Sequence, residues 1–126
     1  MNIEIRDFLI ELSRDKRNPT ITYQKLSDSC NLKLNMQDNP NDRLKIGALL
    51  GEISEFEHIN NRPLISALVI RVTDGEEGDG FYKLAEKLGY GKFKKLKEDL
   101  FEYEQIKKCV DFWTNDINYK LYKNII

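Results

Sequence analysis

The chain has 126 residues, of which 40% are hydrophobic and 33% are charged, and its formal net charge is −1. This length suits one domain, and no apolar run approaches the roughly 20 residues that a membrane-spanning helix needs. The nearly balanced charge excludes a uniformly basic nucleic-acid-binding surface. The apolar N-terminal segment carries acidic residues, unlike a secretory signal. We therefore expect one cytoplasmic domain over residues 1–126 with no membrane partner.

Three helices are predicted in the N-terminal half. Apolar residues at near-helical spacing predict a first helix over about residues 2–14. The stretch TITYQKLSDSC predicts a short second helix, because the Thr22 hydroxyl can accept hydrogen bonds from the free amides of its first turn. Asp42 can cap a third, longer helix that reaches about His58.

The second half contains the one confident strand prediction. The run PLISALVIRV, residues 63–72, is short, rich in branched residues and bounded by turn signals, so we expect a central strand buried on both faces. After the turn TDGEEGDG, helical spacing resumes at Phe81. A last long helix is predicted across residues 96–113, and residues 114–126 are expected to form a C-terminal helical extension. The fold class is therefore α+β and mostly helical, with about five helices and one central buried strand or small sheet.

The order of these elements matches one form of the winged-helix domain. In that arrangement the third helix lies in the major groove of DNA and the turn after the strand is the wing. The residues that would contact DNA are polar or basic side chains on the second and third helices: Tyr23, Gln24, Lys25, Arg43 and Lys45. The acidic residues of the turn would oppose phosphate binding. A helical bundle with a small strand cap would give the same order of elements.

A weaker pattern concerns metal binding. Glu55 and His58 stand at positions i and i+3, the spacing of carboxylate and imidazole pairs in helical metal sites, and Glu52 lies one turn earlier. Since the chain has one histidine, the alternative is that these residues form the solvated side of the third helix. Cys30 and Cys109 lack CxxC spacing and are expected to be buried thiols.

Three functions remain open at this stage. The preferred one is a non-catalytic interaction or regulatory module with a protein partner and no cofactor, because no nucleophile elbow, P-loop or dinucleotide motif occurs in the sequence. Its surface would be the acidic middle of the chain or an aromatic final segment: Phe112, Trp113, Tyr119 and Tyr122. The first alternative is a winged-helix-like DNA-binding protein. The second is a metal-dependent hydrolase centred on Glu52, Glu55 and His58.

One resemblance to a known family rests on the stretch LLGEISEFEHINNRPLISALVIRVTDGEEGDGFYKLAEKLG and its continuation FEYEQIKKCVDFW. It resembles a group of uncharacterised bacterial proteins with a G-R-P-L-L-S-A-L-V-V core, a P-G-x-G-F-F turn and a tryptophan-containing final helix. The similarity covers about residues 44–113, with Asn61 in place of the first core glycine and Glu77-Gly78 in place of Pro-Gly. It implies a bacterial protein associated with mobile-element, restriction or phage-defence loci.

A second, fainter similarity rests on four segments in order: Thr22-Tyr23 with Leu26, Ile46-Gly47 with Leu49, Pro63 with Val69-Ile70, and Gly78-Asp79-Gly80. They are similar to the pattern T-Y-x-x-L-A, R-x-V-G-x-A-L, P-C-H-R-V-V and a glycine-bearing turn in the DNA-binding domain of alkylguanine transferases and alkyltransferase-like proteins. Leu64 occupies the place of the nucleophilic cysteine, and Leu44 that of the arginine that replaces a flipped base. The resemblance implies a DNA-binding fold without alkyl transfer.

Overall fold

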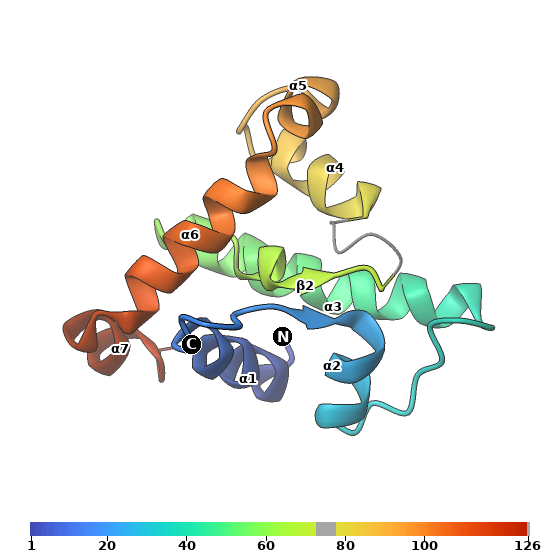
Figure 1. Cartoon of the computed structure of the whole chain (residues 1–126), viewed down its shortest axis with the longest axis horizontal. Coiled ribbons are helices and arrows are strands. Elements are labelled where there is room, and N and C mark those ends of the chain that lie inside the picture. The colour runs from blue at the N-terminus through green and yellow to red at the C-terminus, as the bar shows by residue number, and fades with distance from the viewer. Residues whose placement is uncertain (73–77, 126) are drawn as a thin grey trace.

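The structure is a computed structural model that describes residues 1–72 and 78–125. Over these residues the chain forms helices α1 (Ile3–Ser13), α2 (Tyr23–Ser29) and α3 (Pro40–Ile59), with the short strand β1 (Ile21–Thr22) before α2. A 3-10 helix, η1 (Ile65–Leu68), leads into strand β2 (Val69–Ile70). The chain continues through α4 (Asp79–Lys87), α5 (Phe93–Glu98), α6 (Phe101–Thr114) and α7 (Asp116–Tyr122) (Figure 1). The expected α+β, mostly helical class is confirmed, with seven α-helices in the described residues where about five were expected.

The sheet consists of two short parallel strands. Ile21 pairs with Val69 and Thr22 with Ile70, and α2 and α3 form the connection between the strands. Figure 1 shows β2 lying across the middle of α3, with α1 and α2 on one side and the pair α4 and α5 on the other. This parallel pair is the only sheet among the described residues. Most of the turn predicted to be a wing, residues 73–77, lies outside them.

Polar side chains fix where the first three helices begin. Asn2 accepts a hydrogen bond from the Ile5 amide at 2.9 Å, and Thr22 caps α2 as predicted. The third helix begins earlier than the sequence analysis expected, because Asn39 is its cap and Pro40 occupies its first turn, where the missing proline N–H costs nothing. Asp42 is therefore not the cap.

The run 63–72 is not the continuous strand that its composition predicted. Residues 65–68 form a 3-10 helix, because side chains on other helices satisfy the backbone donors that a neighbouring strand would have bound. The Ser66 amide donates to Ser54 Oγ at 3.0 Å, and the Leu64 amide donates to Gln105 Oε1 at 2.9 Å. The expected burial is nevertheless confirmed from residue 64 to residue 69, and it ends at the half-buried Ile70.

The predicted last long helix is split in two. Leu100 adopts a left-handed backbone conformation with φ of 54°, which ends α5 and starts α6 in a new direction. On one straight helix Leu96 and Phe101 would point about 140° apart. The break lets both side chains enter one buried cluster. Its members come from the run after α3 and from the helices α4 to α6: Leu64, Ala67, Phe81, Tyr82, Ala85, Leu96 and Phe101.

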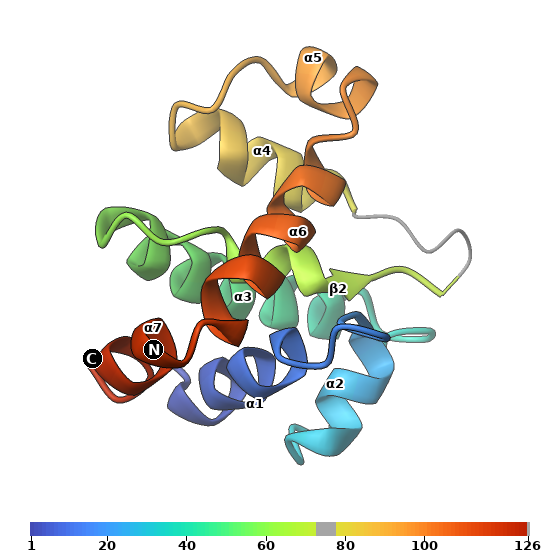
Figure 2. The same cartoon turned by 60° about the vertical axis from the view of Figure 1, so that its left-hand side comes forward.

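The main core lies between α1, α2, α3, η1 and α6, and it includes both cysteines and the fully buried Trp113. Cys30 and Cys109 are free and buried, as expected. The predicted C-terminal helix forms as α7, and its half-buried Tyr119 and Tyr122 pack against this core. Figure 2 shows α7 beside α1 and shows α4 and α5 standing on the opposite side of α3 and α6.

Candidate functional site

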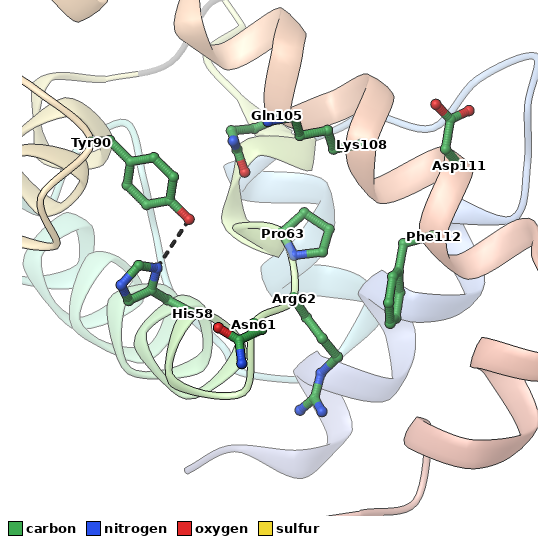
Figure 3. A pocket seen from close by; sticks show the side chains of 9 residues that line it. All are labelled: His58, Asn61, Arg62, Pro63, Tyr90, Gln105, Lys108, Asp111 and Phe112. Atoms are coloured by element: carbon green, nitrogen blue, oxygen red, sulfur yellow. Dashed lines mark hydrogen bonds between the residues drawn. The ribbon is translucent and has the colours of Figure 1, made fainter.

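An open groove of about 580 Å³ lies between the C-terminal end of α3 and the middle of α6 (Figure 3). His58, Asn61 and Arg62 line it from the end of α3 and the residues that follow. Lys108 and Phe112 line it from α6, and Tyr90 closes one side from the connection between α4 and α5. We call this hollow the α3–α6 groove. Concave sites with a few convergent polar groups are where ligands most often bind.

The chain reverses sharply where the groove begins. Asn61 has a left-handed backbone conformation with φ of 61°, which asparagine tolerates better than other non-glycine residues. The Arg62 amide then donates to the Glu57 carbonyl at 2.8 Å and closes the end of the helix. In Figure 3 the Arg62 side chain extends downward, away from His58 and Tyr90, and its Nε reaches the Glu57 carboxylate.

A buried ionic cluster supports the floor of the groove. The Glu57 carboxylate is fully buried and accepts from Arg6 Nε at 3.0 Å and from Arg62 Nε at 2.5 Å. Two guanidinium groups share one carboxylate, so the cluster carries an excess positive charge. The other two guanidinium nitrogens of Arg6 donate hydrogen bonds to the carbonyls of Tyr122 and Lys123. These carbonyls lie at the C-terminal end of α7, where a helix carries partial negative charge.

Arg62 is less completely bonded than Arg6. Its side chain is 4% exposed and lies against the rings of Phe56 and Tyr122, with its guanidinium carbon 5.3 and 5.5 Å from the two ring centroids. Its Nη2 is buried and has no hydrogen-bond partner in the structure. A buried donor without an acceptor is costly.

Tyr90 and His58 form the opposite side of the groove. Tyr90 Oη and His58 Nδ1 are hydrogen-bonded at 3.0 Å, and their rings meet edge to face with centroids 5.2 Å apart. Burial raises the pKa of Tyr90, although Lys108 opposes the shift. Tyr90 therefore stays a neutral phenol at physiological pH, which suits it to hydrogen bonding rather than to acting as a base.

The structure does not assemble the predicted metal ligands into a site. Glu52 is ion-paired with the N-terminal ammonium of Met1 at 2.7 Å, and His58 is bonded to Tyr90. Glu55 is half-buried on α3. Within residues 1–72 and 78–125, no three histidine, cysteine or acidic side chains group closely enough to hold a metal ion.

Two of the five predicted DNA-contacting residues hold the loop between α2 and α3. Gln24 Nε2 donates to the Leu34 carbonyl at 2.9 Å, and its Oε1 accepts from the Met36 amide at 2.9 Å. Arg43 Nη1 donates to the Met36 carbonyl at 2.7 Å. These bonds bring Gln24 and Arg43 to the same loop and occupy much of the bonding capacity that base recognition would use.

The other three predicted DNA contacts differ in exposure. Tyr23 is half-buried and packs against the main core. Lys25 is exposed on α2, and Lys45 is exposed on α3, with its Nζ 3.9 Å from an Asp42 carboxylate oxygen. The aromatic final segment proposed as an interaction surface is mostly structural, because Trp113 is fully buried and its aromatic neighbours pack on the core.

A second hollow of about 370 Å³ lies on the N-terminal half of α3. Leu32, Leu34 and Leu49 line it together with Ala48, and Lys45 and Glu52 also border it. Beside it, α3 exposes Leu44, Gly47 and Ala48 to solvent.

The sequence analysis missed Arg6, Arg62 and Glu57. A detectable signal existed for two of them. Arg6 shares the apolar spacing of Leu9 and Ile10 on α1, and Glu57 follows Ile53 by four positions on the buried side of α3. Charged residues at core positions of two helices, with opposite signs, indicate a buried pair. Arg62 follows the helix, so no periodicity could reveal it.

Comparisons of the chain with protein-family models, with curated proteins and with solved structures found no match. None of the described helices is long and apolar enough to cross a membrane.

Proposed function

We propose that this chain is a non-catalytic interaction module that binds an acidic segment of a partner protein in the α3–α6 groove. The observation that carries the proposal is the excess positive charge of the buried cluster, in which Arg6 and Arg62 share the Glu57 carboxylate and Arg62 lines the groove. A carboxylate in the groove would balance this excess charge. The setting would be the cytoplasm, which the sequence predicts, and a mobile-element or defence system, which the resemblance to the uncharacterised bacterial group implies.

The charges at the rim support an acidic ligand over a basic one. On α6, Lys108 pairs with Glu104 at 2.8 Å and Asp111 pairs with Lys107 at 3.0 Å, so these four charges cancel. The remaining charge beneath the groove is the positive excess of the buried cluster. Electrostatic complementarity of this kind selects the partner and the orientation more than it sets the affinity.

A peptide titration tests this proposal. The amide spectrum of the labelled protein would be recorded with a glutamate-rich peptide and with a lysine-rich peptide of the same length. We expect saturable shifts at Asn61, Arg62 and the residues of α6 that line the groove, from the acidic peptide alone. Lys108→Glu should weaken binding several-fold, whereas Lys107→Glu, the same change on the outer side of α6, should not. Equal shifts from both peptides, or none at low salt, would refute the proposal.

Winged-helix-like DNA binding is the second candidate. Its support is the set of exposed cations on α2 and on the first turns of α3: Lys25, Arg43 and Lys45. In addition, two segments of the alkyltransferase-like similarity meet where Thr22 of β1 pairs with Ile70 of β2. This proposal requires an affinity for duplex DNA that falls steeply with salt and drops in Arg43→Ala and Lys45→Ala. The absence of binding at low salt would exclude it.

A further inference from the structure

The N-terminal half of α3 presents an apolar surface that nothing else in the described chain covers. Leu44 is 72% exposed, and Gly47 and Ala48 are exposed on the same side of the helix, with Gly51 one turn further on. The hollow lined by Leu32, Leu34 and Leu49 adjoins this surface. We call the surface formed by Leu44, Gly47, Ala48, Gly51 and this hollow the open face of α3.

No contact among the described residues requires glycine at either Gly47 or Gly51 of the open face. Each glycine within a helix is less favourable than alanine by about 1 kcal/mol. Neither Gly47 nor Gly51 has a positive φ, and a Cβ atom built on either would meet nothing within 4 Å. Small residues on a helix surface allow another backbone to approach closely. The glycines therefore fit a contact that lies outside the single chain.

The charges that border the open face are self-complementary. Lys45 and Glu52 stand seven positions apart, and their side chains are 67% and 56% exposed. If two copies of α3 cross antiparallel about a twofold axis near Ala48, Lys45 of each copy faces Glu52 of the other. The same crossing places Leu44 of each copy over Gly51 of the other. A DNA backbone on this face would instead meet the Glu52 carboxylate.

We infer that the open face of α3 is the interface of a homodimer in which the two α3 helices pack antiparallel. Each contact then occurs twice, as a twofold interface requires. Leu44 of each copy packs over Gly51 of the other, and the two Lys45 to Glu52 pairs fix the register. Glu52 retains an oxygen for this contact beside its pairing with the Met1 ammonium, because a carboxylate accepts several hydrogen bonds.

A charge-exchange experiment tests the dimer. Sedimentation at low salt should show the wild-type chain in a concentration-dependent dimer. Lys45→Glu and Glu52→Lys should each shift dissociation to at least tenfold higher concentration, because each variant sets like charges opposite one another. An equimolar mixture of the two variants should dimerise again, since opposite charges then face each other across the axis. Lys107→Glu, on α6, is the control and should dimerise like the wild type.

A second variant separates the interface from the fold. Gly51→Gln should keep or raise the Tm of the monomer, because glutamine favours the helix and the position is open. It should abolish the dimer by blocking the approach of Leu44 from the second copy. A wild-type chain that stays monomeric at the highest concentration reached would overturn the inference. So would a dimer that persists in Gly51→Gln or in both charge variants.

Discussion

The two halves of α3 differ in how the rest of the protein encloses them. From Leu50 to Ile59 the helix buries four residues, including the Glu57 carboxylate, and most of the others are half-buried. From Pro40 to Leu49 it buries Asp42 and Ile46, and most of the remaining side chains are exposed. The enclosed half pairs the Glu57 carboxylate that it buries, whereas the open half tolerates Gly47, which no contact among the described residues requires. One helix thus supports the fold at one end and offers a surface at the other.

The largest effect should follow from removing the carboxylate of the enclosed half. Glu57→Gln leaves Arg6 and Arg62 as buried cations without a counter-charge, and we expect a loss of about 3–5 kcal/mol in the free energy of unfolding. Urea denaturation followed by Trp113 fluorescence would measure it. The matched change in exposed Glu52, Glu52→Gln, measured at a concentration where the chain is monomeric, should stay within about 0.5 kcal/mol of wild type. Similar losses in both variants would remove the distinction between the two regions.

A core truncation next to the enclosed half should be nearly as damaging. Leu68 is fully buried in η1, which is bonded to α3 through Ser66 and Ser54. Leu68→Ala should cost about 2–5 kcal/mol through lost burial and the cavity left behind. Ile70→Ala should cost less because Ile70 is half-buried. Chemical denaturation of both variants gives the comparison, and an equal cost would mean that β2 is more enclosed than the structure shows.

In the open half, a substitution should stabilise the chain. Gly47→Ala adds a methyl group where no atom lies within 4 Å and improves helix propensity. We expect a gain of about 0.5–1 kcal/mol, measured by thermal denaturation at a concentration where the chain is monomeric. Gly89→Ala is a suitable contrast, because Gly89 has φ of 94° and alanine would be strained there. A loss of stability in Gly47→Ala would show that α3 is more closely packed at this end.

The smallest effect concerns an exposed ion pair outside α3. Hydrogen bonds from Lys123 and then Tyr119 hold the pKa of Glu11 below its ordinary value of 4.5. The ionised carboxylate therefore stabilises the folded chain above pH 4.5, and this contribution is lost as the pH falls through the lower folded-state pKa. Because the pair is exposed, it should contribute less than about 1 kcal/mol. Lys123→Met should remove this part of the acid dependence of the Tm, and an unchanged pH profile would contradict the pairing.

The sequence was most informative where local chemistry decides the structure. The Thr22 cap, the first helix and the burial of residues 64–69 follow from side-chain pattern and capping alone. The third helix began early because Asn39 and Pro40 together form a stronger start signal than Asp42.

Tertiary contacts decided the features that the sequence left unpredicted. The branched apolar composition of residues 63–72 predicts a strand. Ser54 and Gln105, which are distant in sequence, instead accept hydrogen bonds from its amides and permit a 3-10 helix. The break at Leu100 depends on two side chains reaching one cluster. The α3–α6 groove combines residues from α3, α6 and the connection at Tyr90, so no single segment carries its pattern.

The parallel pairing of β1 and β2 also bears on how the chain folds. Because α2 and α3 lie between the two strands, Ile21 can meet Val69 only after a long loop of chain has closed. Closing such a long loop costs conformational entropy before the contact contributes any stability. We therefore expect the strand pair to form after the transition state for folding. Substitutions at Ile21 should then speed unfolding while leaving the folding rate nearly unchanged in stopped-flow experiments. The strand pairing would then control the unfolding rate, and therefore the lifetime of the native state.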